Sequence, residues 1–410
     1  MGDWIALAGA MAAVAVAADA PGVLLVSVLT IGYGLLTSVW TRYGMLRVEY
    51  SRRLGTSRAV AGDSVPLDVT IWNRKRLPLP WVTAEDRLGD RLHVRERPEM
   101  QVDDYQQGTL LLRNDWALQW YERVVRHFHL DDVRRGSYRF GPVQLRVRDI
   151  LGRLASEERV ELSDTLVVAP AMAAVRQAEH ETSPLGERRA RHSLTVDPAL
   201  FAGVRPFQAG DSQRLVHWRA TARLGSAVSR RFEPARGRTV MLVVDVQTVD
   251  GPVLTWDEDA FESLTVVAAS LARRLLADGA SLGMAAANFA GSAQRFAWLA
   301  PRASMAQLPR AGELLARIGP VPSAPLSALL AWLTRRMPAE AALILVTARD
   351  PGLHLAALRR MKRMGFGVEL MTVGPEAEAN AQAARLARLR AMTGTVEPSW
   401  EKPDAVILAG

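Results

Sequence analysis

A short arginine-rich stretch near the middle of the chain carries the residues best suited to chemistry. The stretch reads Val204-Arg205-Pro206-Phe207-Gln208-Ala209-Gly210-Asp211-Ser212-Gln213-Arg214-Leu215-Val216-His217-Trp218-Arg219-Ala220-Thr221-Ala222-Arg223. Gly210 and Asp211 indicate a tight turn, and Arg214, His217 and Trp218 follow at near-helical spacing. An indole can anchor such a segment to a neighbouring domain while an imidazole nitrogen binds a carbonyl or carboxylate.

Asp211 and His217 could also form an acid–base pair beside Ser212 as a nucleophile. The chain has no Gly-x-Ser-x-Gly elbow and no His-Glu-x-x-His motif, and no lysine lies nearby. Arginines do not act as bases, and paired with Asp211 they would lock an inter-domain joint. We therefore favour a structural clasp or a partner-binding surface, with no catalytic residue, and keep a hydrolase using Asp211 and His217 as the alternative. The residues assigned to this surface are Arg205, Gly210, Asp211, Arg214, His217, Trp218 and Arg223.

A second candidate site follows the apolar run Val240–Val244, at Asp245. A strand-terminal Asp-x-Ser-x-Ser holds a divalent cation in von Willebrand factor A-type domains, through hard oxygen ligands. Here Gln247 offers one amide oxygen and Val249 offers nothing, while Asp350 is a possible further carboxylate. We expect a degenerate cation site without metal or other cofactor, in which Asp245 bonds to loop amides. A metal-dependent enzyme using Asp245 is the alternative.

The elements around Asp245 indicate an α/β domain. Val240–Val244 is continuously apolar, as in a parallel strand covered on both faces. A helix is expected from Asp257 to Gly279, where Phe261, Leu264 and Leu271 recur at helical spacing. Further strands are expected at Leu282–Phe289, Leu343–Thr347 and Val368–Val373, and further helices at Met305–Ile318, Leu326–Arg336, Leu355–Met364 and Ala377–Met392. The alternation predicts a doubly wound sheet, whose ligands bind beyond the carboxyl ends of the strands.

The preceding region, about residues 45–170, has a β pattern. Val65-x-Leu67-x-Val69-x-Ile71 and Val143-x-Leu145-x-Val147 alternate with period two. Turn residues separate the short strands, so an antiparallel β-sandwich is expected. His127 and His129 would share one strand face, but no third ligand of matching character lies nearby, and we interpret them as a solvated face.

The first forty residues are apolar enough for a membrane. Trp4–Ala18 and Ala20–Thr41 carry no charge apart from the Asp19 between them. The second run of 22 residues is about 33 Å long as a helix, which matches a hydrocarbon core of about 30 Å. The turn residues after Ala18 separate two spans. We predict a transmembrane helical hairpin, about residues 3–19 and 21–41.

The hairpin should leave the body of the protein in the cytoplasm. Arginines follow the second span at Arg42, Arg47, Arg52, Arg53 and Arg58, whereas the turn has none. A cleaved signal peptide is the competing interpretation, because Ala18-Asp19-Ala20 resembles a cleavage site, but no basic residue precedes the apolar run. We expect a multi-pass protein of the inner (plasma) membrane, with the lipid bilayer as its first partner.

Composition excludes several function classes. The 410 residues include no cysteine, which excludes disulfides, thiolate metal sites and a catalytic thiol. The formal charge is +8, and the chain holds no Gly-Lys pair and hence no P-loop. The only lysines are Lys75, Lys362 and Lys402. The excess of arginine could suit nucleic acid, but no recognised binding fold accompanies it, so neither nucleic acid nor a small-molecule substrate is expected.

The central stretch resembles the signature of the bacterial family called domain of unknown function 58, roughly R-x-Y-x-x-G-D-x-x-R-x-I-H-W-x-x-S-A-R. Phe207, Val216 and Thr221 depart from it mildly. A second motif agrees, namely Arg134-Arg135-Gly136-Ser137-Tyr138-Arg139-Phe140-Gly141-Pro142, and so does the order of membrane hairpin, β domain and von Willebrand A-like domain. The resemblance implies a protein partner, an AAA+ ATPase of the MoxR type, and a role in assembly or maturation of other proteins.

The sequence thus predicts four regions and one kind of function. The regions are a transmembrane hairpin (1–41), a β-sandwich domain (45–170), a connector with the family signature (171–238) and a von Willebrand A-like α/β domain (239–410). The expected function is that of a membrane-anchored, cytoplasmic-facing scaffold or adaptor rather than an enzyme.

Overall fold

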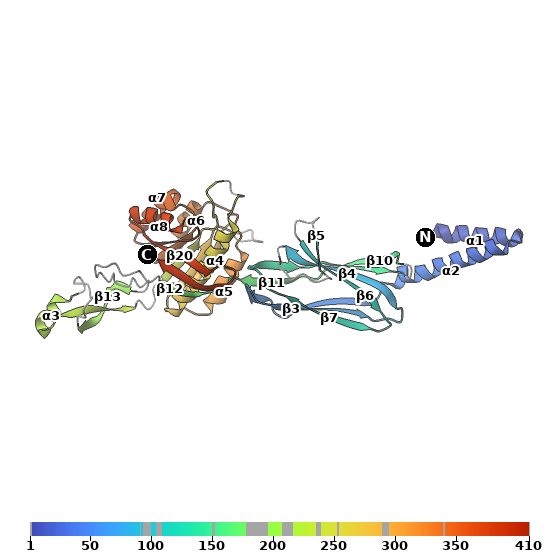
Figure 1. The fold of residues 1–410 in the computed structure, drawn as a ribbon, viewed down its shortest axis with the longest axis horizontal. Helices are drawn as coiled ribbons and strands as arrows, with labels where there is room; N and C mark the ends of the chain where they lie inside the picture. The colour runs from blue at the N-terminus through green and yellow to red at the C-terminus, as the bar shows by residue number, and fades with distance from the viewer. Residues whose placement is uncertain are drawn as a thin grey trace. The chain divides into compact units, whose positions relative to one another are not determined.

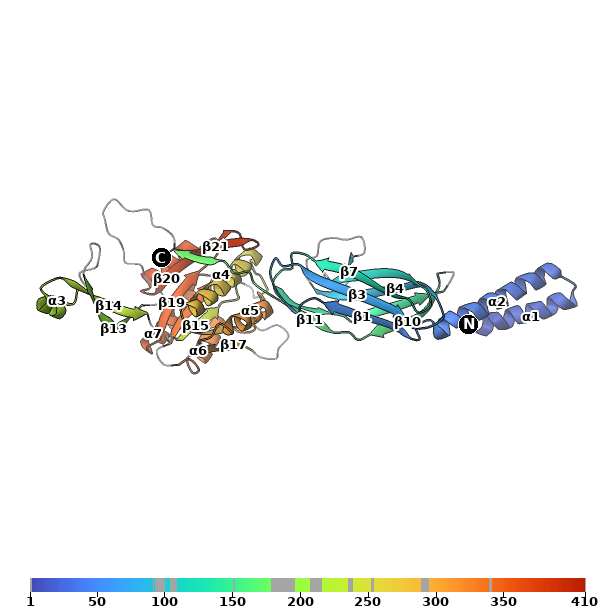
Figure 2. The same ribbon diagram turned by 90° about the horizontal axis from the view of Figure 1, so that it is seen from below.

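The computed structural model of the chain describes residues 2–90, 92, 100–103, 109–149, 152–177, 196–206, 216–234, 239–251, 254–288, 295–338 and 341–409. The chain forms two compact units, Met1–Val167 and Val168–Gly410. Figure 1 shows the helices and strands of both units along the chain, and Figure 2 shows them from a second side.

Two apolar helices begin the first unit. α1 (Gly2–Ala17) and α2 (Pro21–Tyr43) pack along each other in both Figure 1 and Figure 2. Within the described residues, α2 is the helix that is long and apolar enough to cross a bilayer. α1 has 16 residues, or about 24 Å of helix, which is shorter than a hydrocarbon core of about 30 Å. One helix is therefore long and apolar enough to span a membrane, and the hairpin of two spans stays a prediction.

The rest of the first unit is β structure in three sheets. Their strand orders are β1-β3-β7, β10-β9-β4-β6-β5 and β2-β11-β8, and the pairs in the first two are antiparallel. The strands are β1 (Val48–Leu54), β2 (Arg58–Val60), β3 (Val65–Asn73), β4 (Leu79–Asp90), β5 (Met100–Asp103), β6 (Thr109–Leu118), β7 (Arg123–Leu130), β8 (Gly136–Phe140), β9 (Val143–Arg148), β10 (Leu154–Val160) and β11 (Asp164–Ala169). Alternate residues of β3 and β9 are buried, which confirms both predicted strands.

One buried arginine joins all three sheets. Arg52 of β1 forms an ion pair with Asp86 of β4 and donates from Nε and Nη2 to Asp164 Oδ2 of β11, at 3.0 and 2.8 Å. Tyr50 donates its hydroxyl to Asp86 Oδ2 at 3.0 Å, and the guanidinium lies 5.3 Å from the centre of the Phe140 ring. Burial raises the pKa of Asp86 while Arg52 opposes the rise. The side chains of Arg52 and Asp86 are fully buried. Water cannot solvate either charge, so each is neutralised by the other.

The second unit is built on an eight-stranded sheet with the order β12-β21-β20-β19-β18-β15-β16-β17. Five strands run parallel to one another, namely β15, β16, β18, β19 and β20. β17 pairs antiparallel with β16, and β21 pairs antiparallel with β20. β12 pairs parallel with β21. The strands are β12 (Ala174–Gln177), β15 (Thr239–Val244), β16 (Ser281–Ala286), β17 (Ala297–Arg302), β18 (Ala342–Thr347), β19 (Gly367–Thr372), β20 (Arg390–Pro398) and β21 (Pro403–Ala409). The mixed α/β class is thus confirmed, and the chain enters this sheet at β12.

Helices cover both faces of this sheet. α4 (Glu258–Ala277) and α5 (Gln307–Arg317) contribute to one buried apolar core, and α6 (Leu326–Leu333), α7 (Leu355–Arg363) and α8 (Ala377–Leu386) contribute to the other. Side chains of β15 alternate between the two cores, with Leu242 and Val244 in the first and Met241 and Val243 in the second. This is why Val240–Val244 is apolar without interruption.

The predicted elements of this unit agree with the structure to within a few residues at their ends, except near the C-terminus; Phe289, the predicted end of one strand, lies outside the described residues. The helix predicted over Ala377–Met392 ends at Leu386, and β20 follows from Arg390. Arg388 has a positive φ of 61°, a conformation that ends the helix and that non-glycine residues seldom adopt. No glycine marks this turn, so helical spacing in an alanine-rich sequence extended the prediction too far.

Between β12 and β15 the chain forms a two-stranded antiparallel ribbon. β13 (Val196–Pro206) pairs with β14 (Val228–Pro234), and the short helix α3 (Trp218–Leu224) lies between them in the sequence. Because β12 and β15 both belong to the eight-stranded sheet, the segment that carries the ribbon leaves this sheet and returns to it.

Candidate functional site

Asp245 and Arg349 meet at the carboxyl edge of the parallel sheet. Asp245 directly follows β15, and Arg349 comes two residues after β18, the neighbouring parallel strand. The Asp245 amide donates to the Val346 carbonyl at 2.9 Å, which extends the pairing of the two strands by one residue. The fold thus brings together two side chains that are 104 residues apart, at the edge where such sheets bind ligands.

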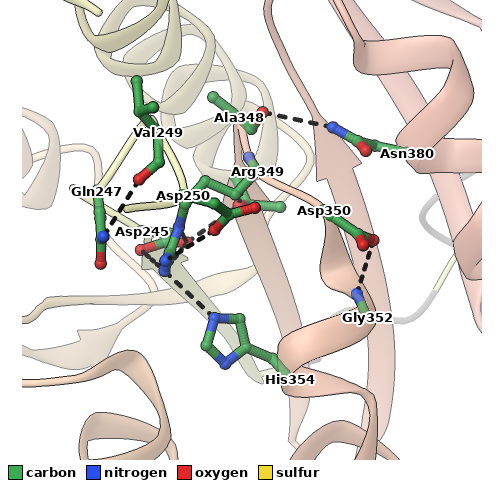
Figure 3. A network of polar contacts seen from close by, with 11 residues as sticks. Asp245, Gln247, Val249, Asp250, Ala348, Arg349, Asp350, Gly352, His354 and Asn380 are labelled. Carbon is green, nitrogen blue, oxygen red and sulfur yellow. Dashed lines mark hydrogen bonds and ion pairs between the residues drawn. The ribbon is translucent and has the colours of Figure 1, made fainter. Parts of the chain in front are cut away.

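The Asp245 carboxylate is saturated by protein donors (Figure 3). Arg349 Nε and Nη2 donate to Asp245 Oδ2 at 3.1 and 2.9 Å, and Nη2 also lies 3.1 Å from Oδ1. The Thr347 hydroxyl donates to Oδ2 at 3.0 Å. The side chains of Asp245 and Arg349 are only 4% and 6% exposed. Burial raises the pKa of Asp245, and the guanidinium opposes this by favouring the charged carboxylate.

A second layer of polar groups surrounds the guanidinium. Asp250 Oδ1 lies 3.4 Å from Arg349 Nη1, and His354 Nε2 lies 3.2 Å from Nη2. Arginine can only donate, so Nε2 is the acceptor and the proton of the neutral imidazole belongs on Nδ1. Burial lowers the pKa of His354, and the Arg349 charge adds to that effect against the neighbouring carboxylates. The imidazole is therefore a neutral acceptor at neutral pH.

The other residues predicted at the cation site bond elsewhere (Figure 3). Gln247 Nε2 donates to the Val249 carbonyl at 3.2 Å, and Asp350 Oδ1 accepts from the Gly352 amide at 2.8 Å. That second bond caps the 3-10 turn η3 (Pro351–His354). Among the described residues no group of three or more His, Asp or Glu side chains could hold a metal ion.

The arrangement differs from the expectation that Asp245 would bond to loop amides. Its partners are the side chains of Arg349 and Thr347, which the sequence analysis did not consider. The guanidinium occupies both oxygens of a carboxylate that, as a hard oxygen ligand, could otherwise bind a divalent cation. In the sequence, the only local sign of this Arg349–Asp245 pair is that an arginine directly precedes Asp350 at the end of a buried strand.

The described part of the central stretch is a helix cap. His217 is the N-cap of α3, and its Nδ1 accepts from the Ala220 amide at 3.1 Å. Arg223 lies in the last turn, where a cation favours the helix dipole, and Gly225 ends the helix in the left-handed conformation. Trp218 is 69% exposed, so its indole is available at the surface of this unit.

The remaining residues of the stretch are described in part or not at all. Arg205 lies in β13 opposite Ser229 of β14, and its side chain lies outside the described residues. Gly210, Asp211 and Arg214 also lie outside them. The structure therefore brings His217, Trp218 and Arg223 onto one short helix, and the pairing of Asp211 with His217 stays a prediction.

One family model matches part of the chain. The family model described as "Protein of unknown function DUF58" matches residues 203–321, which include His217, α3, β15 and Asp245. The uncharacterized protein YeaD of Bacillus subtilis (strain 168) is 27% identical over 250 residues, which cover 59% of this chain and 56% of YeaD. The match therefore spans about half the length of that relative.

Similarity to solved structures is distant. The CARDB domain of a Pyrococcus furiosus protein is 12% identical, with 30% of this chain and 91% of that chain covered and a TM-score of 0.20. A cohesin module from a family 33 glycoside hydrolase of Clostridium perfringens is 8% identical, with 30% and 96% covered and a TM-score of 0.21. We draw no conclusion from similarities of this size.

Proposed function

We propose that this protein is a membrane-anchored scaffold or adaptor whose α/β unit binds a protein partner. In this proposal α1 and α2 form a multi-pass anchor in the inner membrane, and the body faces the cytoplasm. The partner is an AAA+ ATPase of the MoxR type, and the process served is assembly or maturation of envelope or other proteins. The α/β unit is a von Willebrand A-like domain that uses its carboxyl edge for docking.

The observation that carries the proposal is the Asp245–Arg349 pair. A cation-dependent site would need the Asp245 carboxylate to accept a metal ion, and the bidentate guanidinium already uses both of its oxygens. A buried pair of this kind neutralises the edge of the sheet without a metal ion. The edge then presents Asp250, which is 47% exposed at its side chain, for polar contacts with another surface.

The two surfaces to which we assign docking both lie in the region matched by the family model. Residues 203–321 hold both the helix α3, with its exposed Trp218, and the strand that ends at Asp245. Exposed tryptophan is typical of residues that dominate protein interfaces. No catalytic group is needed for either contact.

Photo-cross-linking in native membranes tests the proposal. A benzophenone amino acid at Trp218 or at Asp250 should cross-link to an AAA+ ATPase, and the same group at the exposed His129 of β7 should not. Recovery of lipids and chaperones alone from both positions contradicts the adaptor role. Protease treatment of intact cells gives an independent check, since digestion of the α/β unit from outside contradicts a cytoplasmic body.

The hydrolase and the metal-dependent enzyme make different demands. The hydrolase requires His217→Ala to abolish function while His217→Asn, which keeps a helix cap, abolishes it equally. The metal enzyme requires the wild type to bind magnesium or manganese. We expect calorimetry to show no binding to the wild type, because Arg349 donates to both oxygens of Asp245.

A further inference from the structure

The strands of the first unit bring several turns to the end where α2 stops. β1 begins at Val48, five residues after α2, and Val48 pairs with Asn73 at the end of β3. Trp72 in turn pairs with Arg123 at the start of β7. The loop after β3 and the turn between β6 and β7 therefore both lie at the end of the β region that adjoins α2.

Three hydrogen bonds fix α2 to this end. Trp40 Nε1 donates to the Pro78 carbonyl at 3.1 Å, and Lys75 Nζ donates to the Gly44 carbonyl at 3.0 Å. The Tyr33 hydroxyl reaches Asp149 Oδ2 at 3.4 Å. Trp40 is 7% exposed and Lys75 is 8% exposed, so the junction is packed rather than a free linker. Wherever α2 enters a bilayer, the end of the β region must come with it.

That end displays large aromatic and apolar side chains to solvent. Trp120 is 65% exposed, Tyr121 57%, Trp81 53%, Leu46 56% and Tyr43 45%. The turn that carries Trp120 and Tyr121 is held in place, because the Tyr121 amide donates to the Lys75 carbonyl at 3.1 Å. These side chains are not needed for the core, and tryptophan and tyrosine are the residues that concentrate at the headgroup layer of membranes.

The charge at this end is mainly positive. Arg42, Arg47, Arg74, Arg76 and Arg123 are all exposed. The exposed arginines outnumber the nearby Glu49, which pairs with Arg74, and Glu122, which accepts from the Gln119 amide at 2.6 Å. Each arginine near an anionic leaflet contributes about 1 kcal/mol to membrane binding. Aromatic and arginine side chains together match the chemistry of an anionic bilayer surface.

We propose that this end of the β region is a second membrane-binding surface, distinct from the helices, that inserts Trp120 and Tyr121 into the headgroup layer of anionic lipid. It rests on the proposed function only in that α2 is taken to be embedded in the membrane. The surface fixes the depth and tilt of the β region relative to the bilayer, because its aromatic turn is bonded to the same loop that holds the end of α2.

Spin-label accessibility in the full chain tests this surface. The chain has no cysteine, so single labels can be placed without background substitutions. Gln119→Cys puts a nitroxide beside Trp120 while both aromatic residues remain. Ser57→Cys is the matched exposed control, because it follows β1 at the end opposite Val48. Leu29→Cys, on the exposed face of α2, reports whether the anchor itself lies in lipid.

The labelled chains are reconstituted in vesicles of phosphatidylcholine and phosphatidylglycerol. We expect Leu29 to collide mainly with oxygen, Ser57 mainly with a water-soluble nickel chelate, and Gln119 with both, as at an interface. Replacement of Trp120 and Tyr121 by serine should return the Gln119 label to the aqueous values of Ser57.

The outcomes separate the two proposals. Aqueous values at Gln119 with Leu29 in lipid overturn the second surface and leave the anchor intact. Aqueous values at Leu29 overturn the anchor of the proposed function. A Gln119 label that is aqueous in these vesicles but buried in native membranes also overturns the surface, since it assigns Trp120 and Tyr121 to a protein partner.

Discussion

The two units each bury an arginine–aspartate pair, and the pairs are placed very differently. Arg52 and Asp86 lie inside the β region, where the side chains of both are fully buried and a second carboxylate comes from Asp164. Arg349 and Asp245 lie at the edge of a parallel sheet, where the outer partner Asp250 is 47% exposed. The first pair ties three sheets together, whereas the second fills the position at which an α/β sheet would otherwise bind a ligand.

This difference shows that the same ion pair can serve two purposes. Inside the β region the pair cannot separate without leaving a charge in a dry core, so its role is structural. At the sheet edge Arg349 keeps a second, partly exposed carboxylate, Asp250, when Asp245 is lost. Substitution of the aspartate should therefore lower the free energy of unfolding at both sites, and by more inside the β region than at the sheet edge.

The largest effect is expected at Asp86. Asp86→Asn leaves the Arg52 charge buried with only the partly exposed Asp164, so the unfolding free energy of the β region should fall by about 3–5 kcal/mol. Hydrogen exchange of the β4 amides measures this loss. Glu85→Gln is the control, because its partner Arg146 is 30% exposed, and it should cost less than about 1 kcal/mol.

A smaller loss is expected for the pair at the sheet edge. Asp245→Asn keeps one acceptor for Arg349, which also retains Asp250, so the loss should be about 2 kcal/mol, as for a charged hydrogen bond. Exchange of the β15 amides reports it. Asp250→Asn should leave these amides almost unchanged. A loss at Asp245 as large as that at Asp86 would remove the distinction between the two pairs.

Lys75 extends the comparison to a buried cation that pairs with none of the described carboxylates. Burial lowers its pKa from 10.5 to about 8. Between these values the unfolded chain binds more protons than the folded one, so the free energy of unfolding should rise with pH, by up to about 3 kcal/mol. Thermal unfolding from pH 7.5 to 10.5 should show this slope in the wild type and in Lys402→Met, and should lose it in Lys75→Met.

The smallest effect is expected at His354, which contacts Arg349 of the pair at the sheet edge. Its lowered pKa means that the unfolded chain takes up a proton more readily just below pH 6.5, so stability should fall as the pH falls through that range. His354→Gln should flatten this dependence in the α/β unit, as measured by exchange of the β18 amides. The exposed His127 is the control, and His127→Gln should leave the dependence of the α/β unit in place.

Much of the second unit could be predicted because its buried strands differ sharply from their surroundings. β15 and β18 are apolar without interruption, and the helices between them have clear periodicity. The strands β12, β17, β20 and β21 were not predicted, and two of them, β12 and β17, are the edges of the sheet. β17 has mixed burial and β20 carries polar residues along its length, so both lack a continuous apolar run, whereas the apolar run 405–409 of β21 was missed.

The candidate site was predicted only in half. Asp245 could be identified since a carboxylate at a strand end is a local pattern. Arg349 was not identified, because its pairing with Asp245 depends on β18 lying beside β15, and the arginine next to Asp350 was the only local sign of it. The role of His217 was also open, since an imidazole after a turn is compatible with a base, a ligand or the helix cap that the structure shows.

The ribbon segment has a mechanical consequence. It is continuous at one end with β12, at the margin of the eight-stranded sheet, and at the other with β15, with four strands between them. A pull on β13 and β14 would therefore be transmitted to the sheet at two separated points. A load on this segment would be shared between an edge strand and a central strand of the same sheet.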